Sequence, residues 1–295
     1  KYDFAKTANI PTSFATDHNS VSLGMIDVVL KKKTGKTSFV GEVSFGPRGA
    51  GQSIPDVDGQ SFHIQNLYAT YAASEKLSLT AGYMGTFIGY EVISPLANFH
   101  YSTSYLFTTG PFQNAGIKAN YAVSSKVGLM VGLFNDQWNT YQATPEFGLN
   151  AFGAQLTLAP AEGFTAYFNL LSGSESGTIV DLTAAYQITP KFKLGLNAAD
   201  YSGVESGSGY SGLALYPSVA VSDTFGLGLR AESFKSKTTD TSVAAFTLSA
   251  NLKSGGLTFI PEIRLDSASE KEFYSSNGNP TKSASQVALA MVYGF

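Results

Sequence analysis

Charged side chains stand at alternate positions in several segments of this 295-residue chain. In residues 257–266, Glu262 and Arg264 alternate with Ile263 and Leu265. Successive side chains of a β-strand point to opposite faces, so this spacing puts the charges on one face and the apolar groups on the other. The same parity places these polar residues on one face of their segments: Glu42, Lys118, Asn120, Asn169, Asp181, Lys193, Arg230, Glu232, Glu262 and Arg264.

The signs of these charges are mixed, which leaves two interpretations open. Facing water inside a barrel, they would form a pore lining whose opposed charges bias the passing ions. Paired with one another, they would instead fill the barrel and close it. A barrel of about sixteen strands, the number inferred below, leaves an aqueous channel unless loops block it, which favours the open pore.

Residue types suited to catalysis are sparse. The chain has three histidines, His18, His63 and His100, and no G-x-S-x-G, H-E-x-x-H or P-loop pattern. The absence of cysteine excludes thiolate metal sites and disulfides. The stretch PDVDG at 55–59 starts like a calcium loop, but Leu67 stands where that motif needs Glu, so a plain turn is expected. We therefore expect no enzyme, no metal and no cofactor.

The elements that position the polar residues are predicted to be β-strands throughout. Apolar residues alternate with small or polar ones in segments such as 115–121, 164–171, 192–199, 225–234 and 286–295, and no window sustains a period of 3.6. Segments of about nine to eleven residues match a transmembrane barrel better than a sandwich, because strands of soluble proteins usually have about five or six residues.

Tight turns and longer connections alternate along the chain. Gly, Pro, Ser or Asp residues mark short turns near 34, 74, 124, 160, 189, 222 and 254. The other connections are longer, at about 47–61, 86–112, 135–146, 172–177, 201–208, 235–241 and 267–282. About fifteen strands lie between them, starting near Val21. Because bacterial barrels normally have an even number, we expect about sixteen, with KYDF at 1–4 ending a truncated first strand.

Composition agrees with a membrane barrel. Charged residues make up 14% of the chain against a typical value of about 25%, and the net charge is −3. Lys and Arg do not cluster, so nucleic acid is not an expected partner. Apolar runs are far shorter than the ~18 residues of a spanning helix. We expect that a signal peptide preceded the chain and was removed.

Aromatic residues end many of the predicted strands on the apolar face. An aromatic ring with a polar tip suits the boundary between lipid headgroups and hydrocarbon, although packing inside a sandwich would also explain such rings. The girdle is the favoured interpretation. Its predicted members are Phe39, Tyr71, Tyr83, Tyr121, Tyr186, Phe192, Phe225, Tyr293 and Phe295. Pro217 and Pro261 interrupt strand patterns, and we expect bulges or strand ends there.

The connection 86–112 is long, aromatic and almost without charge. Such a loop would be poorly placed in water, but it could lie against the inner wall of the barrel, as the third long loop of general porins does. Glu91 could then shape the narrow point of the channel, or it could hold the loop to wall residues such as Arg230 or Arg264. Both roles are compatible, because a buried charge must be paired in either case. The predicted constriction residues are Tyr90, Glu91, Asn98, His100, Tyr101 and Ser102.

The same segment carries a resemblance to a known family. It contains Gly-Tyr-Glu at 89–91, followed by Pro95, Asn98 and the run Ser102 to Leu106, and then a strand with Gly116 that ends in Tyr121. In these residues the chain resembles the OmpL-like β-barrel porins, also called the second β-barrel porin family. The opening YDF also looks like the end of that family's first strand. The resemblance implies an outer-membrane pore.

We therefore expect residues 1–295 to form one transmembrane antiparallel β-barrel of about 16 strands in the bacterial outer membrane, with 86–112 as a constriction loop. The expected function is passive diffusion of small hydrophilic solutes or ions. The alternative is a structural barrel subunit of a larger outer-membrane complex, its lumen closed by loops. The expected partners are outer-membrane lipid and the solutes, and both a homo-oligomer and a hetero-complex stay open.

Overall fold

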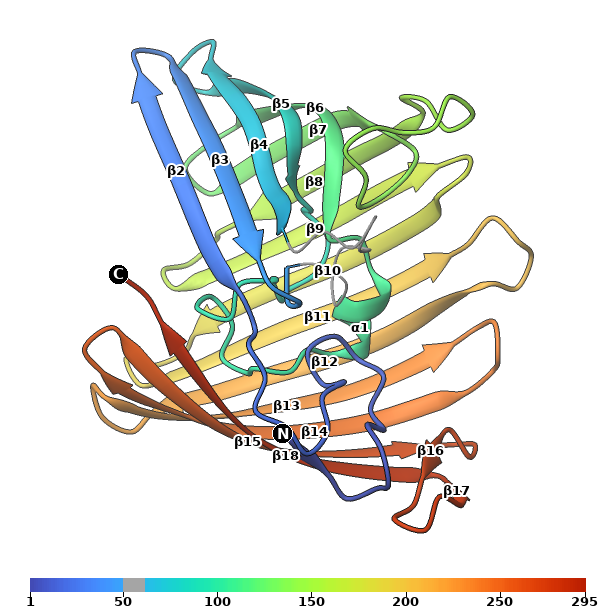
Figure 1. The fold of residues 1–295 in the computed structure, drawn as a ribbon. Coiled ribbons are helices and arrows are strands. Elements are labelled where there is room, and N and C mark those ends of the chain that lie inside the picture. Colours follow the sequence, from blue (N-terminus) through green and yellow to red (C-terminus); the bar gives the residue numbers. More distant parts are fainter. Residues whose placement is uncertain (50–61) are drawn as a thin grey trace.

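The computed structural model describes residues 1–49 and 62–295 and confirms an all-β fold (Figure 1). Sixteen antiparallel strands form one sheet in the order β1-β18-β15-β14-β13-β12-β11-β10-β9-β8-β7-β6-β5-β4-β3-β2. The strands are β1 (Tyr2–Asp3), β2 (Ile26–Thr34), β3 (Thr37–Phe45), β4 (Phe62–Ala72), β5 (Leu77–Gly85), β6 (Gln113–Ala122), β7 (Val127–Phe134), β8 (Ala151–Leu158), β9 (Phe164–Gly173), β10 (Gly177–Gln187), β11 (Phe192–Ser202), β12 (Gly209–Ala220), β13 (Phe225–Ser236), β14 (Ser242–Ser254), β15 (Leu257–Ala268) and β18 (Ser283–Tyr293).

Among the described residues, three short elements lie in the connections. The helix α1 (Tyr105–Thr109) belongs to the connection between β5 and β6, and the two-stranded hairpin of β16 (Phe273–Tyr274) and β17 (Pro280–Thr281) belongs to that between β15 and β18. In the described part of the chain, no helix is long and apolar enough to cross a membrane.

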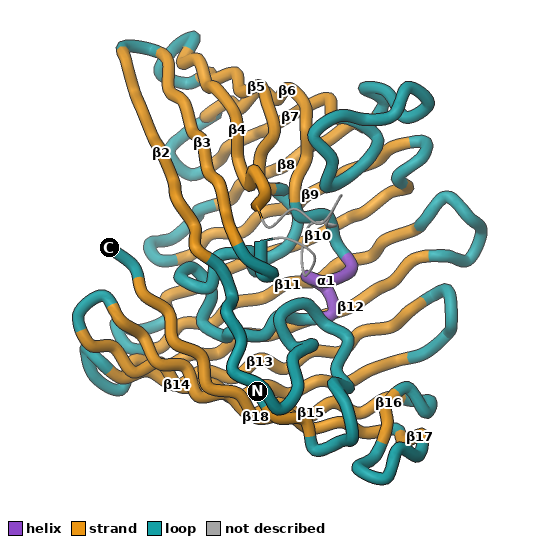
Figure 2. Tube along the Cα trace, viewed as in Figure 1, coloured by secondary structure: helices purple, strands orange, loops and turns teal. Residues whose placement is uncertain are grey.

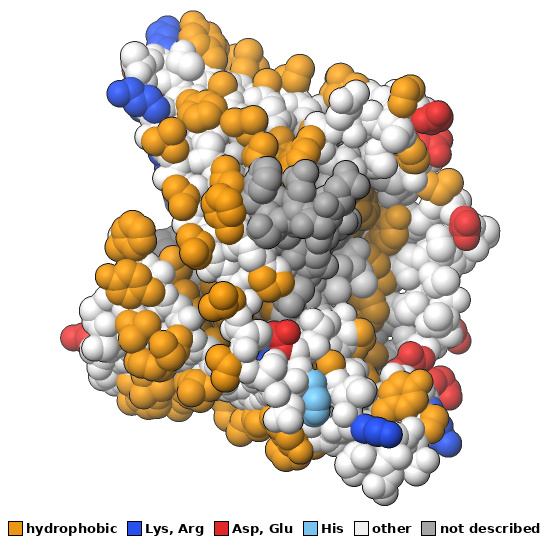
Figure 3. Space-filling model, viewed as in Figure 1, with side chains coloured by type: hydrophobic (Ala, Val, Ile, Leu, Met, Phe, Trp, Pro, Cys, Tyr) orange, Lys and Arg blue, Asp and Glu red, His pale blue; other side chains and the backbone are white. Residues whose placement is uncertain are grey.

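The alternation predicted from the sequence is the basis of the barrel wall. In β15, Ile263 and Leu265 are 52% and 55% exposed on the outside, whereas Arg264 between them is 0% exposed on the inside. Figure 3 shows hydrophobic side chains gathered on the outer surface of β2 and β3, where Ile26, Val28 and Leu30 are exposed. An apolar outer wall facing lipid with a polar inner wall is the arrangement of a transmembrane barrel.

The structure confirms the predicted positions of the tight turns and of the connection 86–112. Each predicted tight turn joins two consecutive strands, and the predicted connection 86–112 fills the interval between β5 and β6. Tyr2 and Asp3 pair with Val287 and Gln286 of β18, so KYDF does supply the sixteenth strand. The next strand begins at Ile26 and not near Val21 as predicted.

The expectation of bulges or strand ends at the two prolines is wrong. Pro217 pairs with Leu194 within β12, and Pro261 pairs with Leu289 within β15. On their other sides the ladders to β13 and β14 skip these positions and then resume in the same register. Because proline lacks only its own N–H, the hydrogen bonding is lost toward one neighbouring strand alone.

Six of the nine predicted aromatic residues are exposed, Phe192 and Phe225 are half-buried, and Tyr83 is buried. Phe39, Tyr71, Tyr121 and Tyr186 are exposed on the outer wall near the tight turns, as are Tyr293 and Phe295 at the end of the chain. Tyr83 is 6% exposed, because its ring packs edge-on against Tyr141 of the connection 135–150 at a centroid distance of 5.0 Å. A loop residue therefore covers this ring.

The connection 86–112 lies in the space that the strands enclose (Figures 1 and 2). Residues 4–25, which join β1 to β2, pass beside it. The buried apolar cluster combines both segments with the wall, since it contains Ile10, Ile88 and Leu106 together with Ile179 and Phe234. This core sits inside the barrel, between the wall and the loops.

Candidate functional site

The loop 86–112 is bound to the wall through Arg230 of β13. Arg230 Nη1 donates to Glu91 Oε1 at 2.8 Å and to the carbonyl of Ser102 at 2.6 Å, and Nη2 donates to the carbonyl of Thr103 at 3.2 Å. Arg230 and Glu91 are 0% and 7% exposed. A guanidinium offers five N–H donors in a fixed plane, so one side chain joins two distant parts of the loop to the wall.

Arg264 of β15 forms a second attachment. Its Nη1 donates to the carbonyl of Thr103 at 2.8 Å and to Thr12 Oγ1 at 2.7 Å. Its Nε and Nη2 donate to both oxygens of Asp266, at 2.9 and 3.0 Å. Asp266 also accepts a hydrogen bond from the hydroxyl of Tyr105 at 2.8 Å. The pair therefore ties β15 to the loop and to the N-terminal segment.

Two wall carboxylates bind backbone N–H groups of the loop. Glu232 accepts from the amides of Tyr105 and Leu106, both at 2.9 Å, and Glu262 accepts from the amides of Tyr101 and Ser102 at 2.9 and 3.2 Å. The first N–H groups of α1 have no partner within the helix, so a carboxylate at this end both satisfies them and suits the local positive potential.

Inward-facing glycines of the wall leave room for loop side chains. A Cβ on Gly195 of β11 would collide with the Tyr90 ring, and one on Gly228 of β13 would collide with the Phe99 ring. Tyr90 also stacks on Tyr216 of β12, with ring centroids 4.5 Å apart. The loop therefore fits the wall by shape as well as by charge.

Asn98 and His100 hold the part of the loop beyond Glu91. Asn98 closes a small ring with Val92, whose carbonyl accepts from Asn98 Nδ2 at 2.5 Å. His100 Nδ1 and Ser249 Oγ lie 2.8 Å apart, and Ser249 Oγ donates onward to Glu262 at 2.9 Å. Burial, and then the nearby Arg230 charge, lower the pKa of His100 to about 3. The imidazole is therefore neutral at neutral pH.

The structure separates the predicted pore-lining residues into four that bind the loop 86–112 and others that lie elsewhere on the wall. Arg230, Glu232, Glu262 and Arg264 are at most 3% exposed and bind the loop, so they do not face open space. The remaining predicted residues lie elsewhere on the wall. Asp181 accepts hydrogen bonds from Asn169, Asn197 and the amide of Gly89. Glu42 accepts a hydrogen bond from Asn66. Lys118 and Asn120 are half-buried on β6, and Lys193 is exposed on β11.

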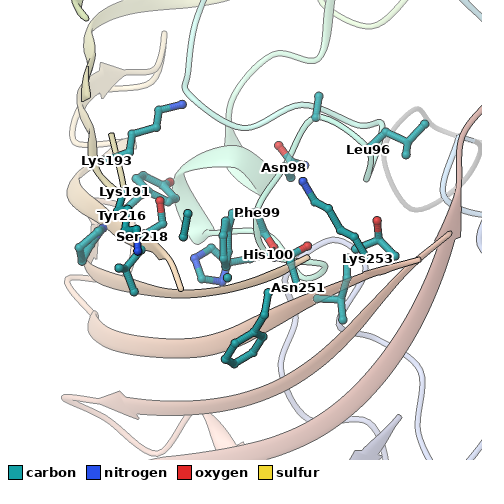
Figure 4. Close-up of a pocket in the computed structure, with 18 of the residues that line it drawn as sticks. Leu96, Asn98, Phe99, His100, Lys191, Lys193, Tyr216, Ser218, Asn251 and Lys253 are labelled. Carbon is teal, nitrogen blue, oxygen red and sulfur yellow. Dashed lines mark hydrogen bonds between the residues drawn. The ribbon is translucent and has the colours of Figure 1, made fainter. Parts of the chain in front are cut away.

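Two cavities border the loop. The larger, of about 690 Å³, lies between loop residues 90–100 and the wall at the end where the tight turns lie (Figure 4). Tyr90, Glu91, Asn98 and His100 border it, whereas Tyr101 and Ser102 do not. The smaller cavity, of about 290 Å³, is bordered by Glu42 and Asp181. Glu91 is part of both linings.

Sequence reasoning missed several residues of this network. Lys191 and Lys253 border the larger cavity. Lys253 shares the inward parity of Asn251 on β14, so parity could have found it, whereas Lys191 lies in the tight turn before β11, where parity does not apply. Thr12 had no such signal, because it lies in a connection without periodicity. Gln65 also had none, since its inward position results from a register shift between β3 and β4 at Glu42/Val43. The predicted turn at 55–59 lies outside the described residues.

The family model described as "Putative beta-barrel porin-2, OmpL-like" matches residues 1–295. No curated protein matches the chain in sequence.

Several solved structures share the fold at low sequence identity. An anion-selective porin from Comamonas acidovorans matches with a TM-score of 0.65 at 13% identity, over 97% of this chain and 96% of that one. OmpT of Vibrio cholerae matches with a TM-score of 0.55 at 11% identity, over 90% of this chain and 87% of that one. OccK8 (OprE) of Pseudomonas aeruginosa matches with a TM-score of 0.55 at 11% identity, over 91% of this chain and 83% of that one.

Proposed function

The chain belongs to the OmpL-like β-barrel porin family, whose members lie in the bacterial outer membrane, and we propose that it lets small hydrophilic solutes or ions cross that membrane by passive diffusion. The observation that carries this proposal is the position of the loop 86–112. It is bound to the wall of β11 to β15, and cavities of about 690 and 290 Å³ adjoin it. Narrowing of a barrel by an inserted loop limits the solutes by size.

In this proposal 86–112 is the constriction. Tyr90, Glu91, Asn98 and His100 border the space through which solute passes, while Tyr101 and Ser102 fix the loop through Glu262 and Arg230. Glu91 would have both roles at once, because one carboxylate oxygen binds Arg230 and the residue borders both cavities. The family and the fold are those of a channel, and we propose no catalysed reaction.

Reconstitution into planar lipid bilayers tests the proposal. The purified protein should insert and give discrete conductance steps in symmetric KCl, whereas detergent without protein should give none. Stable insertion without conductance steps would contradict diffusion through this barrel.

A second candidate function is a structural barrel within a larger outer-membrane complex. It is supported by the N-terminal segment, which fills part of the lumen: Ile10 and Phe14 are each 1% exposed, and Gln286 of β18 donates to the carbonyl of Ala15 at 2.7 Å. Extraction in mild detergent would distinguish the two. A stoichiometric protein partner together with a silent bilayer would favour the structural role, and a conducting barrel without partner would exclude it.

A further inference from the structure

The larger cavity is bordered by three lysines. Lys191 directly precedes β11, Lys193 lies at the start of β11, and Lys253 lies at the end of β14. Figure 4 shows Lys193 and Lys253 reaching into the cavity from opposite sides. Among residues 1–49 and 62–295, no hydrogen bond or ion pair engages any of the three ammonium groups. They differ in this from Arg230 and Arg264, whose guanidinium groups bind the loop.

Negative charge does not balance these lysines. Among the described residues that border the cavity, the carboxylates are Glu91 and Asp223. Glu91 is already bound to Arg230 at 2.8 Å. His100, whose pKa is lowered to about 3, adds no charge at neutral pH. The lining therefore carries three positive charges against one unpaired carboxylate.

The smaller cavity has the opposite character. Its charged lining among the described residues consists of Glu42, Glu91 and Asp181, and no Lys or Arg borders it. Of the two cavities that border the loop, the one with a positive lining among the described residues lies at the end of the barrel where the tight turns are.

We infer that the cavity bordered by Lys191, Lys193 and Lys253 is a binding vestibule for small anions, such as chloride or inorganic phosphate, and that it makes the pore anion-selective from its turn end. The inference rests on the proposed function, since it needs a conducting barrel. Ammonium groups without partners attract anions and repel cations entering the same space. Screening limits this attraction to about 8 Å at physiological ionic strength, so together the three charges should favour anions by about threefold.

Reversal potentials in planar bilayers with a tenfold KCl gradient test the inference. The permeability of the natural protein to chloride should be about threefold its permeability to potassium, and the variant K191Q/K193Q/K253Q should lose this preference. The matched control is K36Q/K76Q/K126Q, which removes the same charge from exposed residues in other tight turns. None of its three residues borders the larger cavity, so it should keep the threefold ratio.

A second measurement needs no variant. Dilute salt screens the three lysine charges only weakly. The preference for chloride should therefore be larger when the dilute solution is on the side of the tight turns than when the gradient is reversed.

The outcomes separate the inference from the proposed function. A silent natural barrel would overturn the function itself. Conducting barrels that prefer potassium, that keep chloride preference in K191Q/K193Q/K253Q, or that ignore the direction of the gradient would overturn the anion vestibule and leave the pore standing.

Discussion

At the scale of single residues, the charges inside the barrel fall into two groups. Arg230, Glu232, Glu262 and Arg264 are buried and bound to the loop. In contrast, Lys191, Lys193 and Lys253 border a cavity and have no hydrogen-bond or ion-pair partner among the described residues. Parity along a strand predicts that the first group, Lys193 and Lys253 face inward. It cannot tell a bound charge from a free one, because that depends on loop residues distant in sequence.

The Arg230–Glu91 pair gives the first prediction. The variant R230M leaves Glu91 buried without its cation, so the free energy of unfolding should fall by roughly 3–5 kcal/mol. Urea unfolding in detergent micelles measures this change. The matched variant K235M removes a cation from an exposed pair with Asp240 and should leave the unfolding midpoint unchanged. Equal effects of R230M and K235M would show that Arg230 does not anchor the loop.

His100 gives a prediction about pH. Its pKa is lowered from 6.5 to about 3 in the folded state, so the unfolded chain takes up a proton in this range that the folded chain does not. Stability should therefore fall as the pH drops from about 6.5 toward 3, and His100 should contribute no pH dependence above that window.

The variant H100Q can still donate to Ser249 but does not titrate. Comparing urea midpoints at pH 7 and pH 5, we expect H100Q to lose less stability on acidification than the natural protein does. The same loss in both proteins would contradict a buried, neutral His100.

At the scale of elements, local pattern predicts strands and turns well. The alternation in β13 to β15 and the turn residues between strands depend on neighbours in sequence alone. The start of β2 was misplaced because Val21 and Leu23 continue the alternation, yet they are exposed and pair with no strand. The position of loop 86–112 inside the barrel was predictable from its composition. Its hydrogen bonds to Ser13 and Asn251 depend on tertiary contacts without a sequence signal.

The glycine positions give the prediction at this scale. In G228A the new methyl group meets the Phe99 ring, and overpacking of this kind should lower the free energy of unfolding by about 1–3 kcal/mol. Gly128 of β7 also faces inward, but a Cβ there would lie 3.4 Å from Thr157, an ordinary contact distance. Urea unfolding should therefore find G128A close to the natural protein. A harmless G228A would mean that the loop does not rest on β13.

At the scale of the whole molecule, the strands of the wall direct apolar side chains outward and polar side chains inward, and the loop 86–112 lies inside the wall. The family model spans residues 1–295, and the three solved structures named above match the fold at identities of 11–13%.

The outer wall gives the prediction at this scale. Because large apolar side chains such as Phe246, Ile263 and Leu289 are 51–66% exposed, the folded protein should need detergent or lipid to stay dispersed. Detergent removal followed by size-exclusion chromatography should give aggregates. A monodisperse folded protein in buffer alone would contradict the lipid-facing wall.

Single-channel conductance with and without the inserted loop tests the account most directly. Replacing residues 86–112 by a short Gly/Ser turn between β5 and β6 leaves the strands intact and removes the proposed constriction. In symmetric KCl, conductance should rise severalfold over that of the natural protein. An unchanged conductance in a folded, inserted variant would contradict the claim that this loop narrows the pore.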